Sequence, residues 1–272
     1  MGFIPKGLST DEPAPVPELP EDFEEFDNFR DMMLLYSCAI REVNTKLENL
    51  DAELEMTGER NPIQYITHRV KTPASIMKKM KRKGIPLTFQ NVWENLNDVA
   101  GVRVVCSYLE DIYELADVLL KQDDIRLIRM NDYIKNPKPS GYRSLHLVIE
   151  TPVFLSEQKH MVRVEIQIRT IAMDFWASLE HQLRYKTDIE IPESIRRDLN
   201  DIADDMFSTD LKMSQINRRI QRISRVKHEA QELARKAQEA EKTGGCEGRR
   251  VRRQRRASEP TGKSDINIAR NL

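Results

Sequence analysis

The segment VRVEIQIR, residues 162–169, constrains the fold more than any other, because apolar and polar residues alternate strictly along it. In a β-strand the apolar residues would share one face, and the opposite face would carry Arg163, Glu165, Gln167 and Arg169. At a sheet edge this polar row would be a solvated face, but a strand this apolar is typical of a sheet interior. We therefore expect a central strand whose polar row lines a cleft.

The sequence around this strand alternates further strands with helices, which is typical of a sheet covered by helices. Strands are predicted in VAGVRVVC, IRLIRM and SLHLVIE, and a helix is predicted from Asp111 to Gln122. SLHLVIE and MVRVEIQIR are separated by a short loop and should pair as antiparallel neighbours. If residues 64–69 add a strand, the fold class is α+β, with a mixed sheet of about five strands flanked by helices.

Long helices are predicted before and after the sheet. Apolar residues recur at steps of three and four from Met33 to Leu54, and a sparser stripe runs within about 209–241. Another helix, after IRT, carries Phe175, Trp176, Leu179 and Leu183 on one face. The narrow apolar seams of the first and last helices suit subunit contacts, and packing on their own domain is an equally good interpretation.

Composition sets the domain limits and the cellular compartment. Residues 1–20 are rich in proline and are predicted to be a disordered lead-in, and the Arg-rich stretch 244–272 a flexible tail, which leaves 21–243 as one domain. A net charge of −1 argues against a protein that binds polyanions over its whole surface. The three cysteines show no metal-binding spacing, and there is no signal peptide or membrane span, so a cytoplasmic protein without membrane contact is expected.

The segment HRVKTPASIMKKMKRK, residues 68–83, holds seven Lys or Arg residues and no acid. Thr72 followed by Pro73 predicts a helix start, because a capping hydroxyl then precedes proline at the first helical position. One face of this helix and the residues just before it supply the polar groups Arg69, Lys71, Ser75, Lys79 and Arg82. A solvated basic face is the alternative, which the absence of interspersed acids disfavours.

Two other segments hold candidate site residues. Asp98, at the margin of the strand VAGVRVV, is a turn residue or a metal ligand, and strict alternation would place Arg103 on the opposite face unless Gly101 forms a bulge. In PSGYRSLHLVIE, Tyr142 and His146 share a face and could stack on a base and bind its phosphates, or be a cross-strand tyrosine and a satisfied histidine. The preceding Ser-Gly pair would let the backbone turn close to a ligand.

Together, HRVKTPASIMKKMKR, DVAGVRVV, SGYRSLHLVI and VEIQIRTIAMDFWASLEHQLRYK resemble the synthetase domain of the RelA/SpoT family, in its short branch, the small alarmone synthetases. The resemblance spans about residues 30–240 and implies a nucleotidyltransferase-like fold. It also implies a GTP/GDP pyrophosphokinase of the stringent response. Such enzymes move the β,γ-pyrophosphate of ATP to the ribose 3′-hydroxyl of GDP or GTP and make ppGpp or pppGpp and AMP.

The resemblance also implies roles for individual residues, by motif position. ATP would be bound by Arg69 and Arg103 at the adenine and by Lys71, Ser75, Lys79 and Arg82 at the phosphates. Asp98 would bind Mg²⁺, and Glu165 would bind Mg²⁺ or take the proton of the attacking hydroxyl. GDP or GTP would be bound by Lys138, Tyr142 stacked on guanine, His146 and Gln167.

Further expectations follow from the same resemblance. A homotetramer is expected, with Tyr65 and Thr67 where some members bind (p)ppGpp as an allosteric ligand. Asn131 stands where relatives often carry a cation, which leaves the preference between GDP and GTP open. No hydrolase activity is expected, because nothing before residue 60 matches the His-Asp metal motif. The alternatives are a catalytically silent regulator that binds nucleotide or RNA, with RNA competing for the basic site, and a nucleotidyltransferase that transfers AMP.

Overall fold

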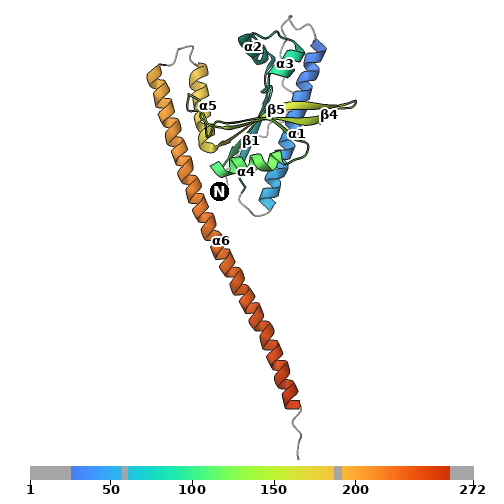
Figure 1. Cartoon of the computed structure of the whole chain (residues 1–272), viewed down its shortest axis with the longest axis vertical. Coiled ribbons are helices and arrows are strands. Elements are labelled where there is room, and N and C mark those ends of the chain that lie inside the picture. The colour runs from blue at the N-terminus through green and yellow to red at the C-terminus, as the bar shows by residue number, and fades with distance from the viewer. Residues whose placement is uncertain (1–25, 57–60, 187–191, 258–272) are drawn as a thin grey trace, which may run out of the picture. The chain divides into compact units, whose positions relative to one another are not determined.

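A computed structural model describes residues 26–56, 61–186 and 192–257 (Figure 1). The elements are α1 (Phe26–Met56), β1 (Ile63–Val70), α2 (Pro73–Lys83), α3 (Phe89–Asn95), β2 (Ala100–Cys106), α4 (Leu109–Leu120), β3 (Arg126–Asp132), β4 (Leu145–Phe154), β5 (Lys159–Thr170), α5 (Ile171–Lys186) and α6 (Glu193–Ala257). The chain divides into two compact units within α6, one ending at Ser214 and the other beginning at Gln215.

The sheet has five strands in the order β1-β2-β5-β4-β3. β2 and β5 are parallel, and the other neighbouring pairs are antiparallel. The mixed sheet of about five strands is thereby confirmed, as is the antiparallel pairing of β4 with β5, which runs from Leu145 opposite Ile168 to Phe154 opposite Lys159. β5 is the central strand, as its alternating pattern predicted.

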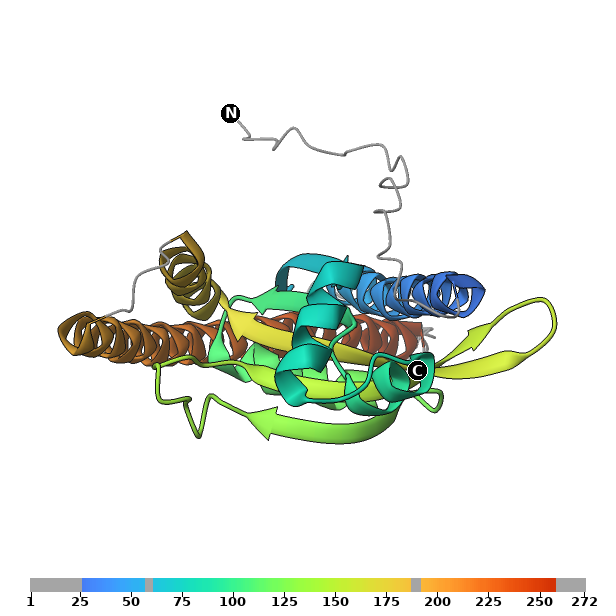
Figure 2. The same cartoon turned by 90° about the horizontal axis from the view of Figure 1, so that it is seen from above.

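One face of the sheet is covered by helices and forms the core. The four alternating apolar residues of β5 are fully buried: Val162, Val164, Ile166 and Ile168. Helices α1 and α4 contact β5, and their apolar residues belong to the same core cluster (Figures 1 and 2). Each such buried side chain contributes about 1.5–3 kcal/mol to the stability of the fold. The opposite, polar face of β5 is left for the site.

Helix α2 begins and ends where its sequence predicts. Its N-cap Thr72 accepts the backbone N–H of Ser75 through its hydroxyl, at 3.3 Å. The chain leaves the helix at Gly84, whose φ of 68° is left-handed, so glycine suits this position. Ile76 and Met80 are buried, and the basic residues of α2 therefore point away from the core.

The apolar seams of the long helices differ in what they contact. The stripe on α1 packs on its own sheet, since Tyr36, Val43 and Leu47 are buried against the core. On α6 the residues Ile216, Ile220, Ile223 and Val226 are 46–69% exposed. The intrachain interpretation therefore holds for the first seam, and the subunit interpretation stays a prediction for the last.

Helix α6 corrects two expectations. It begins at Glu193 rather than near residue 209, and it continues to Ala257, through residues predicted to be a flexible tail. Arg, which supplies six of the residues from 244 to 257, has a high helix propensity even without an apolar stripe. The predicted lead-in, residues 1–20, and the tail after Ala257 lie outside the described residues. No helix in the described part of the chain is long and apolar enough to span a bilayer.

Candidate functional site

The register of the sheet places the polar row of β5 beside polar residues of three other strands. Gln167 lies opposite Arg103 of β2 and His146 of β4, and Arg103 lies opposite Thr67 of β1. Residues opposite each other in a ladder share a face, so these side chains form one row across four strands. One step along the same face, Glu165 lies beside Gly101. The strand pairing itself therefore builds the site.

Asp98 and Arg103 lie together, although strand alternation allowed them to be on opposite faces. Both line one hollow on the sheet, which we call the sheet hollow and which is lined by Thr67, His68, Arg69, Asp98, Gly101, Val102, Arg103, Glu165 and Gln167. Asp98 precedes β2, so its direction is not tied to the alternation of the strand. No bulge forms at Gly101, because β2 pairs with β5 without a register shift.

A second hollow lies against α2, and we call it the basic groove. Its lining residues are Arg69, Val70, Lys71, Thr72, Ser75, Lys78, Lys79, Arg82 and His181. Every residue predicted to bind the ATP phosphates is among them. Arg69 lines both hollows, which therefore adjoin. Lys78 and His181 were not predicted, since no local spacing connects His181, on α5, with the basic segment.

Asp98 connects the basic groove with the sheet hollow. Its Oδ2 accepts hydrogen bonds from Lys71 Nζ at 2.5 Å and Lys79 Nζ at 2.6 Å. Burial alone would raise the pKa of Asp98, but the two lysines hold this pKa below its ordinary value. Its Oδ1 is buried and has no hydrogen-bond partner among the described residues. Asp98 is therefore a charged carboxylate with one oxygen available to a cation.

Two hydrogen-bond donors face the carboxylate of Glu165, one at each oxygen. Gln167 Nε2 donates to its Oε2 at 2.8 Å, and His146 Nδ1 lies 3.4 Å from its Oε1. Burial would raise the pKa of Glu165, but these two neighbours bring the pKa below its ordinary value. Burial also lowers the pKa of His146, so its ring is neutral near pH 7 and acts on Glu165 as a hydrogen-bond donor rather than as a cation.

The predicted residues Lys138, Tyr142 and His146 form an aromatic and cationic group with Tyr133, and we call these four residues the acceptor cluster. Lys138 Nζ lies over both tyrosine rings, 4.5 Å from the centroid of Tyr133 and 4.7 Å from that of Tyr142. The His146 ring stands edge-on to the same two rings, at centroid distances of 5.1 and 5.7 Å. Tyr133 was missed in the sequence, where only the neighbouring Asn131 was noted.

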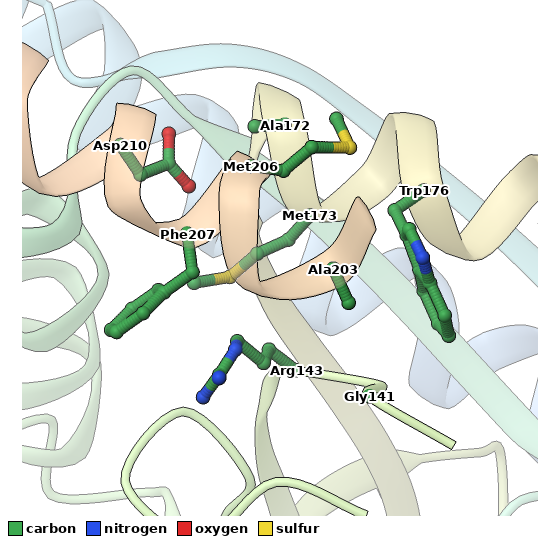
Figure 3. Close-up of a pocket in the computed structure, with 9 residues that line it drawn as sticks. All are labelled: Gly141, Arg143, Ala172, Met173, Trp176, Ala203, Met206, Phe207 and Asp210. Carbon is green, nitrogen blue, oxygen red and sulfur yellow. The ribbon is translucent and has the colours of Figure 1, made fainter. Parts of the chain in front are cut away.

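The loop that carries Lys138 and Tyr142 is held by α6. Figure 3 shows Gly141 and Arg143 of this loop facing Ala203 and Phe207 of α6, around a small hollow. A Cβ atom at Gly141 would lie 2.7 Å from the Cβ of Ala203. The close approach of α6 therefore already requires glycine here, and the approach of this backbone to a ligand stays a prediction.

Tyr65, predicted as an allosteric contact together with Thr67, lies beside the same row. Its hydroxyl donates to Asp174 Oδ2 at 2.8 Å, and Asp174 Oδ1 lies 3.3 Å from Arg103 Nη1. Burial and the contact with Asp174 raise the pKa of Tyr65 to about 12. Thr67 lines the sheet hollow itself. The allosteric role stays a prediction, and both residues adjoin the candidate ATP site.

The chain is similar to known proteins both in a family model and in sequence. Residues 68–190 match the family model described as the region found in RelA/SpoT proteins. The chain is 41% identical over 194 residues to the GTP pyrophosphokinase YwaC of Bacillus subtilis, which covers 71% of this chain and 92% of YwaC.

Two solved structures are also similar. The crystal structure of small alarmone synthetase 2 from Bacillus subtilis has a TM-score of 0.65 and 40% identity, and the match covers 71% of this chain and 100% of that one. Small alarmone synthetase 1 of the same organism, bound to its product pppGpp, has a TM-score of 0.66 and 36% identity, with 71% and 98% of the two chains covered.

Proposed function

Because the chain belongs to the RelA/SpoT family, among the small alarmone synthetases, we propose that it is a GTP pyrophosphokinase that makes (p)ppGpp. It transfers the β,γ-pyrophosphate of ATP to the ribose 3′-hydroxyl of GDP or GTP and releases AMP. The observation that carries this function is one continuous site, in which the basic groove, two carboxylates and the acceptor cluster adjoin on one face of the sheet.

The basic groove suits the triphosphate of ATP. Lys71, Lys79 and Arg82 line it together with the first turn of α2, where free backbone N–H groups and the helix dipole favour an anion. Arg69 and Arg103 line the adjoining sheet hollow, where the adenine would lie. Phosphoryl transfer depends mainly on positioning and on neutralising charge, and this arrangement supplies both.

Mg²⁺ fits the two carboxylates. Asp98 and Glu165 line the same hollow, and Asp98 Oδ1 is buried without a partner among the described residues. Mg²⁺ commonly takes one or two carboxylates from the protein and completes its shell with phosphates and water, so Asp98 and Glu165 would suffice as its protein ligands. When bound, Mg²⁺ would neutralise charge on the phosphates of ATP.

The lowered pKa of Glu165 bears on its role. A general base works best when its pKa lies near the working pH, whereas a metal ligand has to be ionised there. Hydrogen bonds from His146 and Gln167 keep the carboxylate ionised. Both predicted roles of Glu165, metal ligand and proton acceptor, need the ionised carboxylate that these contacts favour.

The acceptor cluster suits a guanine nucleotide. Tyr142 offers an aromatic surface, although Lys138 Nζ lies over its ring. Burial lowers the pKa of Lys138, which reflects an incompletely solvated ammonium that gains from a nearby anion. We therefore expect the Lys138 ammonium to move from the two tyrosine rings to the phosphates of GDP or GTP when the nucleotide binds. This movement would leave the ring of Tyr142 free to stack on the guanine.

Four other parts of the proposed function are supported by membership of the family alone, and a fifth, the oligomeric state, is supported by exposed apolar residues. The four are a role in the stringent response, synthesis without hydrolysis, alarmone as an allosteric ligand and competition by RNA for the basic groove. A homotetramer is supported by the apolar residues that α5 and α6 expose, and a monomer mass in light scattering would contradict it. Release of pyrophosphate from ppGpp by purified protein with Mn²⁺ would contradict synthesis without hydrolysis.

The function is tested by incubating the purified protein with Mg²⁺, ATP and either GDP or GTP and resolving the nucleotides by anion exchange. AMP should form in step with a guanosine nucleotide that carries two further phosphates. Asp98→Asn is the matched control, because it keeps the side-chain volume and removes a metal ligand, and it should abolish both products together. No product with either acceptor, from folded wild-type protein, would favour the silent regulator.

A further inference from the structure

Arg169 and Arg163 are the two residues in the polar row of β5 for which sequence and family suggest no role, and only Arg169 contacts candidate ligands of the guanine nucleotide. The side chain of Arg169 is only 4% exposed. Its guanidinium donates hydrogen bonds to four acceptors: Ser144 Oγ at 3.4 Å, Asp174 Oδ1 at 3.1 Å, the Tyr142 hydroxyl at 2.6 Å and Gln167 Oε1 at 2.8 Å. Two of these acceptors, Tyr142 and Gln167, are candidate ligands of the guanine nucleotide.

A first branch of hydrogen bonds runs from Arg169 through Tyr142 and His146 to Glu165. Arginine only donates, so the Tyr142 oxygen accepts from Arg169, and its own proton points to His146 Nε2 at 2.7 Å. The other ring nitrogen of His146 then carries the proton that faces Glu165 Oε1, 3.4 Å away. Arg169, which only donates, and the Glu165 carboxylate, which only accepts, thereby set from the two ends the direction of each hydrogen bond in this branch and the tautomer of His146.

A second branch runs through Gln167. Its Oε1 accepts from Arg169, so its amide nitrogen has to face the other way, where it donates to Glu165 Oε2 at 2.8 Å. Both branches start from the same nitrogen of Arg169, Nη2, and end on different oxygens of Glu165. One buried arginine therefore orders the donors of both carboxylate oxygens.

Arg169 is itself held in place by Asp174. This carboxylate is buried and lies in the first turn of α5, where the helix dipole favours negative charge. It also interacts with Arg103 and accepts from Tyr65, so donors from three strands surround it. The negative charge of Asp174 therefore balances the positive charge of Arg169, and the hydrogen bonds of Arg169 described above all go to protein groups.

We propose that Arg169 is a positioning residue for the guanine nucleotide, which fixes the Tyr142 hydroxyl and the Gln167 amide and, through them, both oxygens of Glu165. The proposal deepens the proposed function and rests on it. Lysine cannot replace Arg169, because one ammonium nitrogen does not reproduce the planar fork that reaches Tyr142, Gln167 and Asp174 together.

The test compares Arg169→Lys with Arg163→Lys. Arg163 lies on the same face of the same strand, but it bonds to Glu150, Asn97 and the carbonyl of Glu94 instead of the acceptor cluster. Arg169→Lys should raise KM for GDP about tenfold or more and lower kcat, while KM for ATP changes less than about twofold. Arg163→Lys should leave both KM values near wild type. Equal rises in the two KM values, or equal effects of the two variants, would overturn the proposal.

Two further measurements keep the test decisive if Arg169→Lys folds poorly. Tyr142→Phe keeps the ring and breaks only the first branch, so KM for GDP should rise by a smaller factor, and an unchanged KM would overturn that branch. Side-chain ¹⁵N NMR of wild-type protein reports the His146 tautomer without any turnover. We expect the proton on Nδ1, and a proton on Nε2 would refute the proposal. Absence of (p)ppGpp synthesis by the wild type would instead refute the proposed function.

Discussion

Replacing Gly141 by alanine should destabilise the fold and weaken the binding of the guanine nucleotide together. Gly141 faces Ala203 of α6 (Figure 3). Gly141 has a φ of +82°, and an added Cβ would lie 2.7 Å from Ala203 Cβ and 2.9 Å from Asn200 Oδ1. A left-handed backbone costs an L-residue about 1–2 kcal/mol. An extra carbon forced into packed contact costs about 1–3 kcal/mol more. The free energy of unfolding should therefore fall by about 2–5 kcal/mol.

Gly84→Ala is the matched control. Gly84 also has a positive φ, +68°, but a Cβ added there would meet no atom within 4 Å beyond its neighbours in the chain. This variant should lose only the backbone contribution of about 1–2 kcal/mol. The difference between the two variants in the loss of unfolding free energy measures the contribution of the contact between the loop and residues 193–214 of α6. Adding Ala203→Gly to Gly141→Ala should return part of the loss, as a favourable coupling in a double-mutant cycle.

The assay combines urea unfolding, followed by circular dichroism, with steady-state kinetics. Lys138 and Tyr142 flank Gly141, so displacement of the loop should raise KM for GDP more than KM for ATP. Equal losses of stability in Gly141→Ala and Gly84→Ala, together with no coupling to Ala203→Gly, would refute the packing argument. A large loss of stability with unchanged KM for GDP would refute the functional part of the reasoning.

Three further predictions concern single side chains. Glu165→Gln keeps the size and removes the charge, so kcat should fall about a hundredfold or more, and near-normal turnover would remove Glu165 from the mechanism. Tyr142→Ala should chiefly raise KM for GDP, and an unchanged KM would contradict a guanine contact. Asp132 accepts the backbone N–H groups of Ile134 and Lys135, which outweigh burial and lower its pKa. Its stabilising contribution is present above the ordinary pKa of about 3.9 and is lost as pH falls through the lower folded-state pKa. Asp132→Asn should thus weaken the acid dependence of stability below about pH 4 in urea titrations, and an unchanged dependence would contradict this.

Local patterns predicted the parts of the fold that local physics determines. The alternation in VRVEIQIR identified the central strand because side chains of a strand alternate between faces. Thr72-Pro73 located the start of α2 because capping is decided within a few residues. The extent of α6 was missed at both ends. Residues 242–257 have no apolar periodicity, whereas the helical spacing of Ile195, Leu199, Ile202 and Met206 near the start of α6 was overlooked.

Contacts between distant segments were beyond local patterns. Asp174 meets Tyr65, 109 positions earlier in the chain, and only the sheet order and the placement of α5 bring them together. Arg169 was visible as one of four polar residues, but its role depends on partners from two other segments. His181 joined the basic groove for the same reason. The residue types of the site were therefore predictable, and the network that orders them was not.

The most direct test of the central claim follows the β-phosphorus of ATP. Wild-type protein is incubated with Mg²⁺, GDP and ATP labelled at the β-phosphate, and the labelled products are separated. If the enzyme transfers pyrophosphate, the label should enter the guanosine product in its new 3′-pyrophosphate, and the AMP should be unlabelled. Label released as free pyrophosphate, with AMP joined to the acceptor, would contradict pyrophosphate transfer and identify an AMP-transferring enzyme on the same fold.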